Sequence, residues 1–220
     1  RLGYDGKGQA MVRSVDDIDS AVAELGGKDL IAEQWVAFDR EVSAIGARNV
    51  KGDIAIYPLT ENEHREGILS VSRAPAEVGS LEDRATTFLT SLLNKLDYVG
   101  VLALELFVVG DELLANEFAP RVHNSGHWTI EGAETSQFEN HLRAILDMPL
   151  GNTDVRGSAG MLNLIGEMPD VEDVPTSKWH LHNYGKNPRP GRKLGHATIV
   201  AKDDETREKA LKTLAKTLNI

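Results

Sequence analysis

The feature that most limits the fold is a pair of strand-like runs, "GVLALELFVV" and "ELLANEFAP", that flank Gly110 and Asp111. Apolar residues alternate along both runs, which predicts a β-hairpin. If the turn takes three residues, Glu105 lies directly opposite Glu117, whereas a two-residue turn would break this opposition. The alternation places the core on the face that carries Leu102, Leu104, Leu106, Val108, Leu114 and Phe118.

The rest of the chain mixes helices and strands without a regular strand–helix–strand order. Helical spacing predicts helices over residues 15–25, 79–98 and 135–150, and from about residue 203. Strands are predicted at 9–13 and 30–36, in an antiparallel pair at 40–49 and 52–61, and in short segments beyond residue 150. This order predicts an α+β fold rather than a doubly wound parallel sheet.

Charge and residue usage narrow the classes of function. The formal net charge of −10 argues against a bulk electrostatic grip on nucleic acid or an anionic membrane. The absence of cysteine excludes disulfides and Cys-ligated zinc within this chain, and it is compatible with the cytoplasm. No apolar run reaches transmembrane length. Because the chain starts at Arg1 rather than Met, we expect a fragment or a processed form.

The predicted hairpin brings together two carboxylates. Like charges opposite each other destabilise a sheet, so Glu105 and Glu117 should share a proton or a cation. Mg²⁺ suits them, because it takes few protein oxygens and completes its shell with phosphates and water. The alternative is a solvated sheet face with two unrelated glutamates.

A dense group of polar side chains follows the hairpin in "APRVHNSGHW" (119–128). It contains Arg121, His123, Asn124, Ser125 and His127. Such a density at a strand end is typical of a site loop, and Arg suits bidentate anion recognition. The alternative is a polar loop that caps the next helix.

Three further stretches carry weaker signals. In "EQWVAFDRE" (33–41), a main-chain segment could pair with adenine while Glu41 accepts from ribose hydroxyls. The opening "GYDGKGQ" could cradle a phosphate, although it is neither the Walker nor the dinucleotide sequence. "RPGRKLGH" (189–196) could bind a phosphate ester. The alternatives are a loop with surface acids, a hairpin turn and a basic surface turn, respectively.

Together these stretches resemble one family. The resembling segments are "GYDGKGQ", "EQWVAFDREVS", "YPLTENEHREGIL", "YVGVLALELFV", "NEFAPRVHNSGHWTIEGAETSQFENHLRAI" and "RPGRKLGH". They run from Gly3 to about His196 and resemble the ATP-grasp carboxyaminoimidazole ribonucleotide synthetases, the PurK type. The "APRVHNSGHWT" run separates this family from formyltransferase and biotin carboxylase relatives.

The resemblance implies a fold and a reaction. The fold is ATP-grasp, with antiparallel sheets and packed helices: a lid part at 1–41, a large subdomain at 42–150 and a β-rich C-terminal part at 151–220. In the reaction, ATP phosphorylates bicarbonate to carboxyphosphate. That species, or CO₂ released from it, carboxylates the exocyclic amine of 5-aminoimidazole ribonucleotide in purine biosynthesis.

The resemblance also implies roles for particular residues. The Mg²⁺ ligands would be Glu105 and Glu117, and the bicarbonate and carboxylation site would hold Arg121, His123, Asn124 and Ser125. The ribonucleotide phosphate region would include Arg192 and Lys193. The ATP site would comprise Gly3, Tyr4, Asp5, Gly6, Lys7, Gly8, Gln9, Glu33, Gln34, Trp35, Val36, Glu41, His64, Asn116 and Glu117.

This chain departs from the family pattern at its start. The family has a further domain before the glycine loop, which supplies part of the ribonucleotide site, and a nucleotide-contacting lysine upstream of that loop. This sequence contains neither. We therefore expect this chain alone to bind ATP weakly and to have little or no synthetase activity. The resemblance also implies a cytoplasmic homodimer.

Three other interpretations stay open from the sequence. The chain could be an ATP-grasp ligase of another purine intermediate, or a nucleotide-binding module without activity. It could also be the homologous portion of a fused eukaryotic carboxylase.

Overall fold

A computed structural model describes residues 8–27, 29–170, 172, 174–175 and 178–219. The chain divides into two compact units. One comprises residues up to Ala37 together with Arg65–Ile68, and the other comprises Phe38–His64 and Leu69–Ile220. The predicted division at 1–41, 42–150 and 151–220 assigns functional parts, which contacts do not test, so it stays a prediction.

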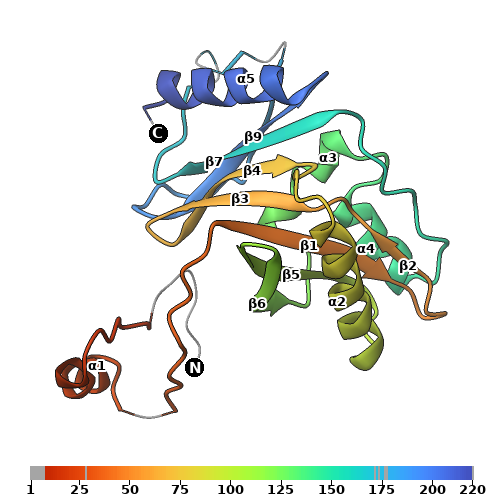
Figure 1. Cartoon of the computed structure of the whole chain (residues 1–220). Coiled ribbons are helices and arrows are strands. Elements are labelled where there is room, and N and C mark those ends of the chain that lie inside the picture. The colour runs from red at the N-terminus through yellow and green to blue at the C-terminus, as the bar shows by residue number, and fades with distance from the viewer. Residues whose placement is uncertain (1–7, 28, 171, 173, 176–177, 220) are drawn as a thin grey trace. The chain divides into compact units, whose positions relative to one another are not determined.

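The larger unit is built on one antiparallel sheet (Figure 1). Its strands follow the order β6-β5-β1-β3-β4-β7-β9-β8, and β2 pairs with β1. The C-terminal strands therefore extend the same sheet that carries the predicted hairpin. The strands are β1 (Arg40–Arg48), β2 (Ile54–Ile56), β3 (Thr60–Arg65), β4 (Ile68–Ala74), β5 (Gly100–Val109), β6 (Glu112–Ala119), β7 (Ser158–Ile165), β8 (His180–Asn183) and β9 (Lys193–Ala201).

Helices cover both faces of this sheet. On one face, α2 (Leu81–Lys95) packs over β1 and β5, and α5 (Asp204–Thr217) packs over β7 and β9. On the other face, buried Trp128 packs against Ile45, Ala103 and Met161. This second face also carries the short helix α3 (Thr129–Gly132) and α4 (Gln137–Ile145). Both faces of the central strands are therefore buried, as the mixture of helices and strands predicts.

The predicted helices are confirmed, and side-chain caps account for two of their starts. Ser136 accepts from the Glu139 N–H at the start of α4, and Asp203 accepts from the Thr206 N–H at the start of α5. In the smaller unit, η1 (Val15–Asp17) and α1 (Ile18–Glu24) form the helix predicted at 15–25. The α+β fold class is confirmed.

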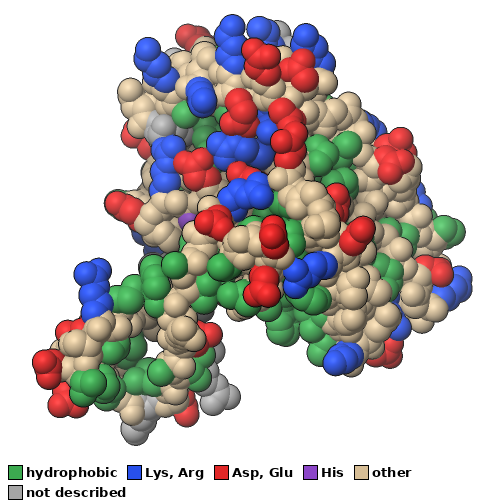
Figure 2. All heavy atoms as spheres, in the orientation of Figure 1, with side chains coloured by type: hydrophobic (Ala, Val, Ile, Leu, Met, Phe, Trp, Pro, Cys, Tyr) green, Lys and Arg blue, Asp and Glu red, His purple; other side chains and the backbone are tan. Residues whose placement is uncertain are grey.

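The strands predicted at 9–13 and 30–36 are wrong. Both segments lie within the described residues, and neither forms a strand. Apolar side chains there are exposed instead: Met11 by 50%, Ile31 by 81% and Trp35 by 69%. Hydrophobic side chains show at the surface of this part of the chain in Figure 2. An extended run becomes a strand only where a neighbouring strand pairs with it, and local pattern cannot supply that partner.

The hairpin reaches the predicted pairing by another route. The turn takes two residues, since Val109 pairs with Glu112. A β-bulge between Glu105 and Leu106 then shifts the register, so that Glu105 pairs with Glu117 after all. The bulge also changes which side chain enters the core. Leu113 is buried in place of the predicted Leu114, which is 40% exposed.

The same hairpin corrects the predicted core in a second respect. Phe118 lies on the predicted face opposite Leu104, but it is 49% exposed, because β6 is an edge strand of the sheet.

The predicted strand pair at 40–49 and 52–61 is confirmed in part. β1 pairs with β2, but Thr60 already belongs to β3, which pairs with β1 separately. Within the described residues, no helix is both long and apolar enough to cross a membrane.

Candidate functional site

A band of polar side chains crosses the face of the sheet that carries Trp128. Side chains along a strand alternate between the two faces of the sheet, and residues paired across neighbouring strands point to the same face. Glu117, Glu105 and Ser43 are partners across β6, β5 and β1, and Asn163, His196 and His182 are partners across β7, β9 and β8. The buried members of this band are Ser43, Thr60, Asn62, Ser72, Asn163 and His196.

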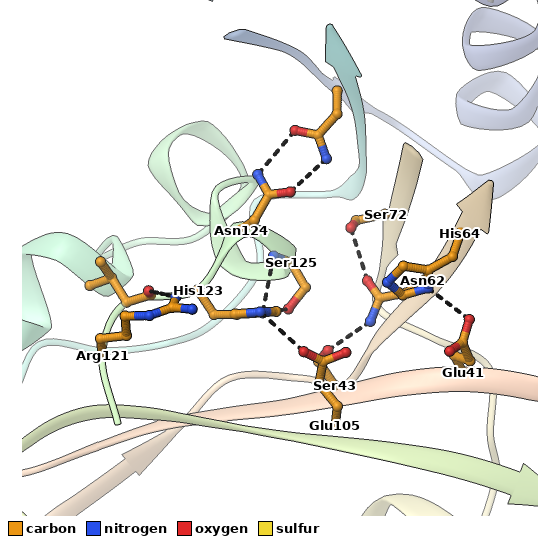
Figure 3. Close-up of polar contacts among 12 residues, drawn as sticks. Glu41, Ser43, Asn62, His64, Ser72, Glu105, Arg121, His123, Asn124 and Ser125 are labelled. Atoms are coloured by element: carbon orange, nitrogen blue, oxygen red, sulfur yellow. Dashed lines mark hydrogen bonds and ion pairs between the residues drawn. The ribbon is translucent and has the colours of Figure 1, made fainter. Parts of the chain in front are cut away.

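His123 connects the hairpin to the loop that follows it (Figure 3). Its Nε2 lies 3.1 Å from Oε1 of Glu105, and its Nδ1 lies 2.8 Å from the Ser125 hydroxyl. Burial acts to raise the pKa of Glu105, but the hydrogen bond and charge of His123, aided by His64 and Lys193, hold that pKa below its usual value. Glu105 is therefore a carboxylate at neutral pH, and its Oε1 accepts a hydrogen bond from His123.

Glu117 has the opposite electrostatics. Burial and the negative charge of Glu105 raise its pKa, although His123 and Arg121 act against this. A cation between the two carboxylates would relieve that repulsion, and two Glu oxygens are the hard ligands that Mg²⁺ prefers. The described residues contain no group of three acidic, His or Cys side chains that could hold a metal. Glu105 and Glu117 therefore suit an ion such as Mg²⁺, which would take its remaining ligands from phosphates and water.

A second pair lies on the same face of the sheet. Nδ1 of His64 is 2.7 Å from Oε2 of Glu41. Next to it, the Asn62 amide donates to Ser43 Oγ and accepts from Ser72 Oγ (Figure 3). Because the charge of His64 acts on both Glu105 and Glu117, this pair lies within electrostatic reach of the two carboxylates. The structure therefore brings together the predicted residues Glu41, His64, Glu105 and Glu117.

The loop at 121–125 is held by side chains that the sequence did not single out. Gln137, fully buried, accepts from the His123 N–H and donates to its carbonyl. The amides of Asn124 and Asn163 bond each other in both directions, at 3.0 and 2.7 Å. A polar Asn within the apolar run "SAGMLNLI" was the one signal that could have identified Asn163.

The basic residues divide into two groups. Arg121 and Lys193 act electrostatically on the carboxylates, since the first lowers the pKa of Glu117 and the second lowers that of Glu105. The Arg192 guanidinium instead donates to the carbonyl of Asn187 within its own turn. The charge of Lys193 thus acts on Glu105, whereas the described side-chain hydrogen bond of Arg192 lies within its own turn.

The remaining predicted residues lie early in the chain, except Asn116, which belongs to the larger unit. The residues Gly3, Tyr4, Asp5, Gly6 and Lys7 lie outside the described residues. Gly8 is described, with φ of 75°, as is Gln9. Glu33, Gln34, Trp35 and Val36 belong to no helix or strand of the described residues. Asn116, at the bulge in β6, precedes Glu117 directly.

Three histidines lie together at the far end of the polar band. The rings of His182 and His196 stack with centroids 4.4 Å apart, and the His127 ring lies 5.3 Å from that of His196. His196 Nδ1 is 2.7 Å from the Tyr184 hydroxyl, while His196 Nε2 is buried and has no hydrogen-bond partner among the described residues. Burial and the neighbouring histidines lower the pKa of His196 to about 3 and that of His127 to about 4.

The low pKa values of His127 and His196 should make the stability of the fold depend on pH. Their folded-state pKa values lie below the unfolded value of about 6.5, so the unfolded state binds more protons between these limits. The free energy of unfolding should therefore fall as pH drops below about 6.5, by about 2 kcal/mol per histidine between pH 6.5 and 5. Urea unfolding at several pH values should show this loss, and His196→Gln should reduce it; an unchanged slope would contradict the assignment.

The chain matches two family profiles. Residues 1–138 match the ATP-grasp domain, and residues 159–210 match the phosphoribosylaminoimidazole carboxylase C-terminal domain. Together the two matches include both glutamates, the loop at 121–125 and the basic residues of β9.

Individual relatives are similar over most of the chain. The N5-carboxyaminoimidazole ribonucleotide synthase of Pseudomonas aeruginosa is 51% identical over 206 residues, covering 93% of this chain and 57% of its own length. The crystal structure of the synthetase from Thermus thermophilus has a TM-score of 0.92 and 53% identity, over 95% of this chain and 59% of that one.

A third relative was solved with ligands. The Aspergillus clavatus N5-carboxyaminoimidazole synthase, in complex with ADP and 5-aminoimidazole ribonucleotide, has a TM-score of 0.84 and 33% identity. The match covers 93% of this chain and 58% of that one. The chain thus spans between half and two thirds of the length of the relatives it matches.

Proposed function

Since the chain belongs to the ATP-grasp family, we propose that it takes part in the ATP-dependent carboxylation of 5-aminoimidazole ribonucleotide, as its relatives' names imply. One observation carries the proposal furthest. Glu105 and Glu117 face each other across β5 and β6, and His123 from the next loop bonds Glu105. The reaction would give N5-carboxyaminoimidazole ribonucleotide in the synthesis of purines.

The reaction would pass the terminal phosphoryl group of ATP to a bicarbonate oxygen, giving ADP and carboxyphosphate. The carboxyl group would then move to the exocyclic amine, with release of phosphate. Mg²⁺ held by Glu105 and Glu117 would offset negative charge on the phosphates. Arg121 and the donors of Asn124 and Ser125 would hold bicarbonate in place, because orientation lowers the barrier for a weakly bound reactant.

The remaining roles follow the same proposal. Glu41, His64 and Asn116 would contact the nucleotide, and the family resemblance implies the same role for residues 3–9 and 33–36. Lys193 and Arg192 would meet the ribonucleotide phosphate; Lys193 has the stronger support, because its charge already acts at the site. The proposal includes a cytoplasmic homodimer. No role in binding nucleic acid or membranes is proposed, in line with the net charge.

The test measures ADP release with bicarbonate and either 5-aminoimidazole ribonucleotide or glycinamide ribonucleotide. It is run on the chain alone and on a chimaera in which the chain replaces the matching 206 residues of the P. aeruginosa relative. We expect stimulation by 5-aminoimidazole ribonucleotide in the chimaera. Stimulation by glycinamide ribonucleotide alone would favour another ATP-grasp ligase, and nucleotide binding without ADP release would contradict an enzymatic role.

A further inference from the structure

Helix α4 turns polar side chains toward the interior. Its buried residues are Gln137, Asn140 and Ala144, whereas Leu142 and Ile145 on its outward apolar side are 54% and 48% exposed. A helix packed on a core normally buries its apolar side instead. A buried amide costs free energy unless its polar atoms are bonded, so the partners of these amides indicate what they do.

The Gln137 amide bonds two residues of the preceding loop, and all its polar groups are used. Its Oε1 accepts from the His123 N–H at 3.0 Å, and its Nε2 donates to the His123 carbonyl at 2.7 Å. The same Nε2 lies 2.9 Å from Nδ1 of His127. Because a backbone N–H only donates and a carbonyl only accepts, His123 fixes which end of the amide carries the oxygen.

This orientation determines where His127 carries its proton. An amide NH₂ only donates, so His127 Nδ1 accepts, and the proton of the neutral ring lies on Nε2. Burial and the charges of His123, His182 and Lys193 lower the pKa of His127 to about 4, although the backbone of His123 acts against this. The ring is therefore neutral at physiological pH, and Nε2–H is the group that it can donate.

Close packing keeps the amide and the loop together. A Cβ atom at Gly126 would lie only 2.7 Å from Oε1 of Gln137, so the loop backbone rests directly on the amide. The His127 ring in turn lies against Tyr184 and His196, with ring centroids 6.3 and 5.3 Å away. A change at position 137 would therefore reach the loop directly.

We propose that Gln137 is a positioning residue of the candidate site, which acts through two histidines at once. It holds the peptide groups of His123, whose imidazole bonds Glu105, and it keeps His127 as a neutral ring that donates from Nε2. Both histidines thereby have a fixed place, and one of them a fixed proton, before any substrate binds. The effect on turnover rests on the proposed function, whereas the position of the proton does not.

The first experiment reads the position of that proton. The chain is labelled with ¹⁵N-histidine, and the ring nitrogen shifts are recorded from about pH 5 to 8, with His127→Gln to assign the signals. We expect an unprotonated Nδ1 and a protonated Nε2 for His127 across this range. In Gln137→Glu, Nδ1 should instead be protonated near pH 6, because a carboxylate of the same size accepts from it. A protonated Nδ1 in the unmodified chain would overturn the proposal without any variant.

Asn140→Asp is the matched control, since it makes the same chemical change at another buried amide of α4. Asn140 bonds the Tyr57 hydroxyl and the backbone of Gly151, and these contacts do not involve the loop. Both variants should lose stability in urea, but only Gln137→Glu should change the His127 ring. An unchanged ring in a folded Gln137→Glu chain, or the same change in Asn140→Asp, would overturn the proposal.

The second experiment measures turnover in the chimaera described above. Gln137→Glu should lower kcat for ADP release with bicarbonate and 5-aminoimidazole ribonucleotide by about tenfold or more, because His123 and His127 would lose their fixed orientation. The KM for ATP should stay within about twofold, and Asn140→Asp should leave both constants near those of the unmodified protein. Normal turnover in Gln137→Glu would overturn the positioning role. An inactive unmodified chimaera would contradict the proposed function instead, and the ring nitrogens would then decide the role of Gln137.

Discussion

Replacing Glu117 by glutamine is expected to reduce ADP formation about a hundredfold or more while the fold stays intact. The variant keeps the size and the hydrogen-bonding capacity of the side chain, but it removes one of the two negative charges that would hold Mg²⁺. Stability should not fall, because the raised pKa of Glu117 means that its charged form is disfavoured beside Glu105. Loss of activity without loss of stability separates a metal ligand from a structural residue.

The measurement uses ADP release in the chimaera described above and Mg²⁺-dependent ATP binding by calorimetry. Glu112→Gln is the control, since Glu112 is an exposed glutamate on the same strand, at the end of the hairpin. It removes the same charge and should leave both readouts near those of the unmodified chain. Normal turnover in Glu117→Gln would remove the metal assignment.

Trp128→Ala is expected to lower the free energy of unfolding by about 3–5 kcal/mol. Trp128 is fully buried, and its indole N–H donates to the Thr60 hydroxyl at 2.8 Å. Its ring also meets Tyr57 edge to face, with centroids 6.5 Å apart. Truncation would leave a cavity in the core cluster that Trp128 forms with Ile45, Ala103 and Met161, and it would remove the donor that bonds the Thr60 hydroxyl. Since a whole domain is stable by only about 5–15 kcal/mol, this loss is a large fraction.

Urea unfolding followed by circular dichroism measures this loss. Trp35→Ala is the matched control, because Trp35 is 69% exposed and its truncation should change the free energy of unfolding by less than about 0.5 kcal/mol. Trp128→Phe should fall between the two, since it keeps most of the buried area but loses the hydrogen bond. Equal effects of Trp128→Ala and Trp35→Ala would show that Trp128 does not support the core.

Much of the larger unit could be predicted from the sequence, because its strands and helices follow their own periods. Alternation along 100–120 predicted the hairpin, and the polar run at 121–125 predicted the loop that meets it. The opposition of Glu105 and Glu117 was predicted from a three-residue turn, whereas the structure reaches it with a two-residue turn and a bulge. The bulge could not be predicted, because the apolar alternation on either side of it is compatible with pairing with or without one extra residue in β6. The wrong placement of Leu114 follows from that.

Other parts of the site depend on long-range contacts. Gln137 and Asn163 hold the loop from an adjoining helix and from a distant strand, and no local pattern reports which backbone groups they will meet. The strands wrongly predicted at 9–13 and 30–36 fail for the same reason, since a strand is defined by its partner. The outward apolar side of α4 likewise became visible only once the buried side was known.

The bulge in the β5–β6 hairpin has a consequence for how the gene can change in length. Because two residues of β6 oppose Glu105, the strand contains one residue more than a regular ladder needs. Loss of one codon between Leu113 and Asn116 would remove the bulge and keep Glu117 opposite Glu105. Loss of one codon from the two-residue turn would leave a single residue, which is too short to connect the paired strands. A deletion in the strand is thus the one that the carboxylate pair can survive.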